Sequence, residues 1–348
     1  MTTYVARGAL TVFLTAALAS GCGSQGAPES EPERVVDQSG TAALAGAFAT
    51  AGEATSYRLS TFTAQKLSSS LLGIDTETEI DEDEPALVAE MTPAVSHLAV
   101  DVSAMLGPIA GEGTDIGFEL WNTPERITVD SRDYAALKEA TPSADLGPFE
   151  PGVSYLDLEA VADDSSDLVA IVVGQGVPDL HQVADDLPES LDDVEQDDRT
   201  ITGRGHYADV MAALGQDVEQ TARSAAAGLA QNLGVDVDEL TELYVDFYGD
   251  APTEVTIELD AEGSLSSIGY TADLSDLYVR VFETPDLFTP RPSAEELEQA
   301  RDLAGDTVWM LTVLQRYDID DDLVVSPAPA TDDDRTAEWL AFLDNAGF

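Results

Sequence analysis

The sequence has a single cysteine, Cys22, and three histidines among its 348 residues. One cysteine cannot form an intramolecular disulfide, and with so few histidines a Cys/His zinc site is not expected. None of His97, His181 and His206 stands in an H-E-x-x-H motif. We therefore predict neither a metal nor a cofactor.

Motifs of common enzymes are missing as well. The chain has no G-x-S-x-G elbow and no Walker A sequence, and Gly174–Gly176 lacks the rest of a dinucleotide-binding motif. His206 beside Tyr207 is interpreted as a pair of strand residues. These absences favour a protein that is not an enzyme, and an extracytoplasmic hydrolase is kept as the less favoured alternative.

Positive charge is scarce, with 15 Lys and Arg residues against 68 Asp and Glu residues and a formal net charge of −53. Such a surface repels phosphate backbones, so nucleic-acid binding is not expected. It also repels anionic lipid headgroups, and residence at a membrane would therefore need an anchor.

Runs of acidic residues raise the question of calcium. None of the runs at 75–84, 318–323 and 331–335 has the Gly and Glu positions of an EF-hand loop. The run at 331–335 precedes a predicted helix, where acidic side chains favour the helix dipole. We predict no specific calcium site.

Long apolar runs are also absent, apart from one at the N-terminus. Ala9–Ala19 has the length of a signal-peptide core and is too short to span a bilayer. Leu18–Cys22 (LASGC) then resembles the lipobox of bacterial lipoproteins, in which the signal is cut before the cysteine and the thiol carries a diacylglycerol. Ala19 departs from the Leu that is commoner at that position, because Leu18 lies one place too early. The resemblance implies lipidation of Cys22, with N-acylation as an added option.

Ordinary secretion is the alternative, since Ala17–Ala19 is an A-x-A cleavage site. It would leave Cys22 as a spare thiol in an oxidising compartment, which makes it less favoured. Residues 23–40 are rich in Gly, Ser, Pro and Glu, a composition that stays extended and solvated. We interpret residues 1–21 as the signal peptide and 22–40 as the acylated cysteine and a flexible tether.

The folded part begins with a helical pattern and continues with short strands. Helix is expected at 41–54 and later at 217–233, which ends before Gly234. Turn-like breaks between sequential strands favour an antiparallel meander over βαβ units. Strands are expected at 56–67, 71–80, 85–91, 97–106, 115–122, 125–130 and 152–162, as a pair within 192–214, as a hairpin at 251–274, and as an edge strand at 277–282, while 167–191 is helical on its later side.

The C-terminal part has a different pattern. Ser293 and Glu296 form a capping box that starts a predicted helix, which continues to residue 317 with a break or kink near Gly305. A Pro-rich linker then leads to a short final helix at about 335–345. We expect residues 283–348 to be a helical C-terminal extension.

The order of elements in residues 41–282 resembles that of extracytoplasmic carriers of the LolA and LppX/LprG kind. The features that carry the resemblance are TSYRLSTF after the first helix, PERITVDSRDY, GVSYLDLEAV, VEQDDRTITGRGHYADVMAAL and EVTIELDAEGSLSSIGY. The resemblance implies an α+β fold, a strongly curved antiparallel sheet (half-barrel) with helices over its concave face and an apolar cavity. It also implies a lipid-anchored protein on the outer side of a bacterial membrane that binds a lipid or acyl chain.

The alternative that the residues leave open is a filled core. Side chains that line a cavity and side chains that fill a core are both apolar, so the sequence does not separate a carrier from a purely structural or interaction lipoprotein.

Overall fold

The structure is a computed structural model that describes residues 38–71, 73–103, 116–142, 146–160, 180–233, 235–288, 291–320 and 322–346. Its strands are β1 (Tyr57–Ser69), β2 (Ile74–Glu77), β3 (Leu87–Met91), β4 (Ser96–Asp101), β5 (Gly117–Asn122), β6 (Arg126–Asp130), β7 (Val153–Asp157), β8 (Asp192–Asp197), β9 (Thr200–His206), β10 (Pro252–Leu259), β11 (Leu265–Asp273) and β12 (Val308–Ile319). Its helices are α2 (Gln38–Ala51), α4 (Tyr134–Ala140), α6 (Leu180–Asp186), α7 (Tyr207–Ala213), α8 (Val218–Leu233), α9 (Val237–Asp250), α10 (Leu277–Glu283), α11 (Ala294–Gly305) and α12 (Thr336–Ala346), with 3-10 turns η1 (Gly147–Phe149) and η2 (Pro285–Leu287).

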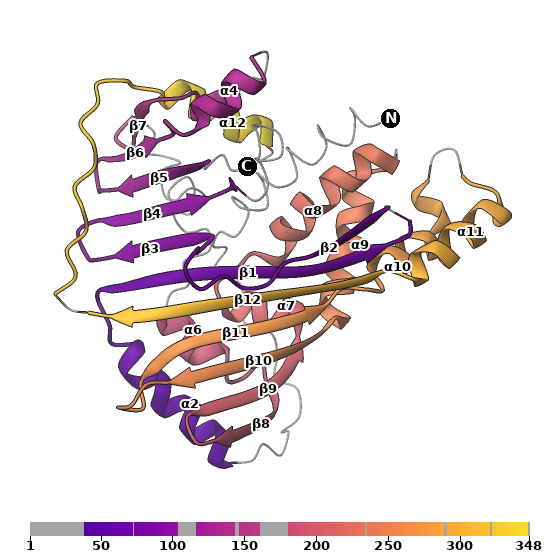
Figure 1. Cartoon of the computed structure of the whole chain (residues 1–348), viewed down its shortest axis with the longest axis horizontal. Coiled ribbons are helices and arrows are strands. Elements are labelled where there is room, and N and C mark those ends of the chain that lie inside the picture. Colours follow the sequence, from indigo (N-terminus) through magenta and orange to yellow (C-terminus); the bar gives the residue numbers. More distant parts are fainter. Residues whose placement is uncertain are drawn as a thin grey trace. The chain divides into compact units, whose positions relative to one another are not determined.

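The strands form a 12-stranded antiparallel sheet in the order β7-β6-β5-β4-β3-β1-β12-β11-β10-β9-β8, and β2 pairs with β1 (Figure 1). From β3 to β7 and from β8 to β12, neighbours in the sheet are also neighbours in the sequence. This confirms the predicted fold class, α+β with an antiparallel meander. It also places the C-terminal strand β12 beside the first strand β1.

The chain divides into two compact units. Unit 1 comprises the described residues within 1–53, 62–82 and 178–316, and unit 2 comprises those within 54–61, 83–177 and 317–348. Each unit has its own buried apolar side chains.

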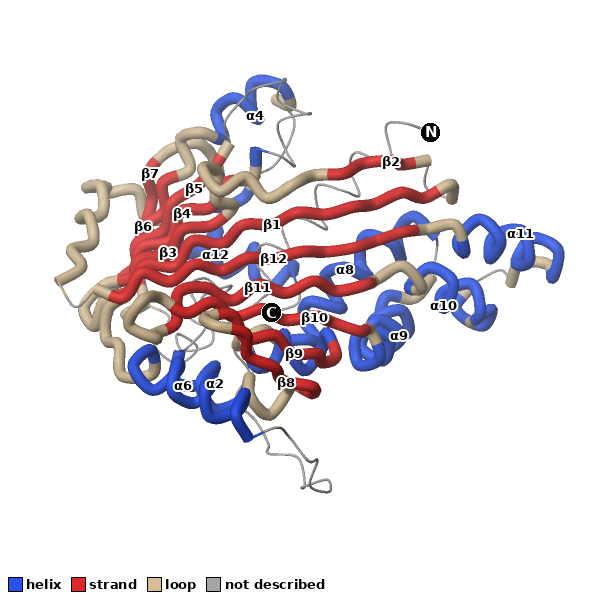
Figure 2. The backbone as a smooth tube through the Cα atoms, turned by 60° about the horizontal axis from the view of Figure 1, so that its bottom comes forward, coloured by secondary structure: helices blue, strands red, loops and turns tan. Residues whose placement is uncertain are grey.

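Unit 1 contains strands β8 to β11 and most of β12, with helices packed on one side of them (Figure 2). Along β10, buried Val255 and Ile257 alternate with exposed Glu254 and Glu258. Val255 pairs with Tyr270 of β11. Helix α2 contacts β11, helix α7 contacts β10, and helix α9 contacts the neighbouring strand β9. The two-residue alternation therefore separates a helix-covered apolar side from an acidic outer side.

Two helix starts in unit 1 carry the side-chain caps that their sequences specify. The Asp236 carboxylate accepts hydrogen bonds from the backbone N–H groups of Asp238 and Glu239 at the start of α9. Ser293 and Glu296 form the predicted capping box at the start of α11.

Unit 2 is a meander built on the first residues of β1. A row of apolar side chains crosses it through cross-strand pairs, from Leu59 through Ala89 and Leu98 to Leu120, and all four are buried. An aromatic cluster continues this core at the β5–β7 end, where rings lie 5.1 to 6.4 Å apart. Its members are Phe118, Tyr134, Phe149 and Trp339.

The C-terminal segment of unit 2 covers the edge of β7. The Tyr155 N–H donates to the Asp333 carbonyl and the Arg335 N–H donates to the Tyr155 carbonyl, both at 2.9 Å. The Thr331 hydroxyl donates to the Val153 carbonyl. An exposed strand edge offers unpaired backbone groups to other chains, and residues 331–335 occupy that edge.

Two predicted elements were wrong. Residues 308–319 form strand β12, not the continuation of a helix, because a run rich in apolar and aromatic residues pairs with β11 after the break at Gly305. Residues 277–282 form helix α10, not an edge strand. Apolar residues alternate in this segment as they would in a strand. Leu277 and Val281, however, are four residues apart, as neighbours on a helix face are, and both are buried.

Three further helices, α4, α7 and α9, were missed. In α9, Leu240, Tyr244 and Phe247 follow the i, i+4, i+7 spacing and are buried, a signal that the sequence contained. Helix α7 follows directly on β9 where only strand was expected. The expected strands at 56–67, 85–91, 115–122 and 125–130, the hairpin at 251–274 and the helices at 217–233 and 335–345 are confirmed to within a few residues, whereas residues 161–179 lie outside the described part.

Two glycines test the packing of unit 1. A Cβ at Gly205 would lie 2.6 Å from the Ser190 carbonyl oxygen, whereas a Cβ at Gly249 in α9 meets nothing within 4 Å. We expect Gly205→Ala to lower the free energy of unfolding by about 1–3 kcal/mol through overpacking. Gly249→Ala should raise it by about 0.5–1 kcal/mol, since alanine favours helix. Urea unfolding followed by circular dichroism measures both, and equal effects would contradict the close packing at Gly205.

Candidate functional site

The predicted lipidation site, Cys22, lies outside the described residues. The histidines are placed apart from one another. His206 is exposed at the end of β9, His181 is exposed in α6, and His97 is half-buried on β4. His97 is joined to acidic side chains on neighbouring strands.

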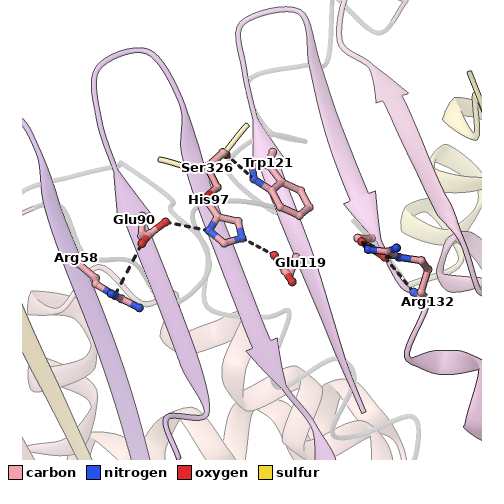
Figure 3. Close-up of polar contacts among 8 residues, drawn as sticks. Arg58, Glu90, His97, Glu119, Trp121, Arg132 and Ser326 are labelled. Atoms are coloured by element: carbon pink, nitrogen blue, oxygen red, sulfur yellow. Dashed lines mark hydrogen bonds and ion pairs between the residues drawn. The ribbon is translucent and has the colours of Figure 1, made fainter. Parts of the chain in front are cut away.

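The pairing of strands β3, β4 and β5 places a polar cluster around His97. The cluster lies on the face of unit 2 opposite its row of apolar side chains. His97 pairs with Glu90 of β3 on one side and with Trp121 of β5 on the other. Its Nδ1 lies 3.1 Å from Glu90 Oε2, and its Nε2 lies 2.8 Å from Glu119 Oε2 (Figure 3). Arg58 of β1 lies at the end of this row, with its Nε 3.9 Å from Glu90 Oε1.

A carboxylate oxygen lies at each ring nitrogen of His97, and an ionised carboxylate only accepts hydrogen bonds. The imidazole therefore links the carboxylates of Glu90 and Glu119 across three strands. The Arg58 guanidinium lies beside Glu90, so cationic and polar groups gather around two carboxylates within a very acidic chain.

Trp121 links this cluster to the C-terminal segment. Its indole stacks on the His97 ring, with centroids 4.6 Å apart and planes at 19°. Its Nε1–H donates to the Ser326 carbonyl at 3.0 Å (Figure 3). Trp121 is buried although it lies on the face opposite the apolar row. The arrangement holds residues near 326 against that face.

A pocket of about 440 Å³ opens on the same face and shares Glu119 with the cluster. The Arg132 guanidinium donates to the buried Asp130 carboxylate at 2.8 and 3.0 Å, which raises the pKa of Arg132. The Ser103 hydroxyl is engaged with the Ile116 backbone. The pocket is lined by Pro85, Val88, Ala99, Val100, Asp101, Ser103, Ile116, Gly117, Phe118, Glu119, Asp130, Arg132 and Asp133.

The acidic runs considered for calcium are used within the chain where the structure describes them. Asp334 accepts hydrogen bonds from the Thr336 N–H and hydroxyl at the start of α12, which lowers the pKa of its carboxyl group. Glu82 pairs with Arg316 at 2.7 Å. Within the described ranges no group of three or more His, Cys, Asp or Glu side chains is arranged to hold a metal ion.

A second candidate region lies on the helix-covered side of unit 1, where tyrosine rings gather. Tyr207 of α7 lies 5.1 Å from Tyr248 of α9, which lies 5.9 Å from Tyr244. Burial raises the pKa of all three. It raises the pKa of Tyr270 on β11 to about 12, against a hydrogen bond with Gln216 that lowers it. The region therefore places neutral phenols among apolar side chains.

Strand β12 supplies the sheet side of this region through a row of alternate residues, Trp309, Leu311, Val313 and Gln315, called here the β12 row. Leu311 pairs with Ala272 and Val313 with Tyr270. Val313 and Gln315 are buried, whereas Trp309 and Leu311 are only half-buried. Part of the apolar surface of the row therefore stays open.

Sequence reasoning identified neither region. His97 was expected only as the first residue of a strand, and nothing local relates it to Glu90 and Glu119. The β12 row was missed because residues 308–317 were interpreted as helix. Strand alternation around Trp309 was the signal that could have found it.

None of the helices in the described part of the chain combines the length and the apolar character that crossing a membrane needs. No protein-family model and no curated protein matches the sequence. Among solved structures, the chain is similar to the Mycobacterium tuberculosis lipoprotein LppX, with 11% sequence identity over 84% of this chain and 100% of that chain and a TM-score of 0.28. A TM-score of 0.28 is too low to assign the chain to that family, so the family resemblance stays a prediction.

The His97 cluster can be tested by a substitution that keeps the ring. His97→Phe retains an aromatic ring against Trp121 but leaves Glu90 and Glu119 without their donor. We expect the free energy of unfolding to fall by about 1–3 kcal/mol, the range for hydrogen bonds to charged groups. Adding Glu90→Gln should restore part of the loss, since it removes one of the two carboxylates that lost the His97 donor.

His206→Phe is the control, because His206 is exposed and makes no side-chain cap bond. It should change stability by no more than about 0.5 kcal/mol. An equal loss in both variants, or no loss in His97→Phe, would contradict the role assigned to the cluster.

Proposed function

We propose that this chain is a lipid-anchored, extracytoplasmic protein of the bacterial cell envelope that binds a lipid or acyl chain on the helix-covered side of its sheet. The proposed role is non-enzymatic. The observation that carries the ligand proposal is the half-buried apolar surface of Trp309 and Leu311, on the side of the sheet where Val313 and Tyr270 are buried.

The anchor is supported by the sequence. An apolar run of signal-peptide length precedes Leu18–Cys22, and a polar, Pro- and Gly-containing stretch follows. A diacylglycerol on Cys22, with or without an N-acyl chain, supplies the two or more chains that stable anchoring requires. The acidic surface then keeps the folded part away from anionic headgroups.

Ligand binding is supported by the chemistry of unit 1. Apolar side chains gain about 25 cal/mol for each Å² removed from water, so a half-buried Leu and Trp are favourable contacts for an alkyl chain. Leu67 of β1 is also half-buried. Alternation from Phe62, whose ring lies under Arg316 on the other face, places Leu67 on the side of Trp309.

The alternative is an envelope protein whose core is filled by its own side chains. In that case the half-buried residues of the β12 row are ordinary surface, and the purified protein holds no lipid. The experiments below separate the two functions.

Cys22→Ala tests the anchor. We expect the variant to move from the membrane fraction to the soluble extracytoplasmic fraction, because the thiol that would carry the acyl chains is gone. Immunoblots of fractionated cells measure this, with Ser24→Ala as a neighbouring control that should stay in the membrane. Membrane retention of Cys22→Ala would contradict acylation at that residue.

Leu311→Gln tests the ligand surface, and Leu314→Gln is its matched control. Both leucines are half-buried on β12, but they point to opposite faces. We expect protein purified from its own host to yield lipid on organic extraction, and Leu311→Gln to retain several-fold less, because each buried CH₂ contact is worth about 0.8 kcal/mol.

Leu314→Gln should retain lipid as the unaltered protein does. Thermal unfolding of both variants separates lost binding from lost folding. Absence of lipid from the unaltered protein would favour the filled core, and equal retention by the two variants would exclude the β12 row as the binding surface.

A further inference from the structure

The indole N–H of Trp309 is a buried donor for which the described residues provide no acceptor. An indole N–H can only donate, and buried tryptophans usually place it on a hydrogen-bond partner. Trp121 follows that rule, since its Nε1–H donates to the Ser326 carbonyl. A buried donor without a partner is unfavourable, so Trp309 marks a place for an acceptor.

The backbone around Trp309 is held firmly. Its N–H donates to Ser275 Oγ at 3.0 Å, and its carbonyl accepts from the Leu274 N–H at 2.8 Å. Its ring stacks on Tyr278 of α10, with centroids 6.1 Å apart and planes at 25°. The indole is therefore fixed between strand β12 and helix α10.

The surroundings of Trp309 are apolar. Leu311 follows two residues later on the same face of β12. Tyr278 packs against a small core formed by Phe282, Leu297 and Ala304. An acyl chain would find hydrocarbon contacts here, and the orphan N–H would add one polar feature among them.

We propose that Trp309 donates its indole N–H to a carbonyl oxygen of the bound lipid, so that the protein selects acyl esters or amides over plain hydrocarbon. This inference rests on the proposed lipid-binding function and names the class of ligand. It assigns Trp309 as the residue that recognises the acyl carbonyl, and the rest of the β12 row as contacts for the chain.

The test compares a matched pair of probes on the full chain in a Cys22→Ala background, in which the acyl chains of the anchor cannot compete. Protein stripped of lipid is loaded with the neutral dye N-phenyl-1-naphthylamine. Displacement of the dye by methyl palmitate and by hexadecane gives two affinities and their ratio. Trp309→Phe keeps an aromatic ring on Tyr278 and removes the donor, while Trp121→Phe removes a donor that is already satisfied.

We expect Trp309→Phe to weaken methyl palmitate binding about tenfold and to leave hexadecane binding nearly unchanged, in line with the loss of one buried hydrogen bond. Trp121→Phe should keep the ratio of the unaltered protein. In ¹⁵N NMR spectra of the unaltered protein, methyl palmitate should shift the Trp309 indole proton downfield and hexadecane should not. The NMR measurement uses the unaltered protein, so it tests the proposal even if the Trp309→Phe variant fails to fold.

An unchanged ratio in a folded Trp309→Phe variant would overturn the inference and leave the lipid-binding function standing. A downfield, slowly exchanging Trp309 indole proton in stripped protein would overturn it too, because the donor would already have a partner. If neither probe displaces the dye, or the dye does not bind, the proposed function itself fails.

Discussion

Both candidate regions depend on the two-residue alternation of side chains along antiparallel strands. On β4, Leu98 points into the core of unit 2 while His97, one residue earlier, lies on the opposite face. On β12, Leu311 and Val313 face the helix-covered side while Leu314 faces away. A shift of one residue in either register would exchange the two sets and remove both arrangements, since the side-chain period is two.

Several arginines of the described residues pair with acidic or aromatic side chains. Arg132 pairs with the buried Asp130, and Arg316 pairs with Glu82 and lies over the Phe62 ring. Exposed ion pairs contribute little to stability individually. The stability of this fold therefore depends on apolar rows and aromatic clusters, and the surplus of carboxylates is left to set the character of the surface.

The fold was predictable in segments whose local hydrophobic pattern matches the surface that they bury in the folded protein. The hairpin at 251–274 and the helix at 217–233 show this, because their periodicities match the surfaces they bury. Prediction failed at 277–282, where apolar residues alternate like a strand but Leu277 and Val281 pack as helix neighbours. It failed again at 308–319, where the helix before Gly305 was extended into a run of β-branched and aromatic residues that pairs with β11 as a strand.

The sequence alone determined the features that depend on adjacent residues: the apolar run before Cys22, the acidic character, the capping box at Ser293 and the alternation of the late hairpin. Only the tertiary structure decided which residues meet across strands. His97 meets Glu119, 22 positions away, and Trp121 meets Ser326, 205 positions away. Such contacts arise from strand order and register, which long-range pairing sets and which no local spacing encodes.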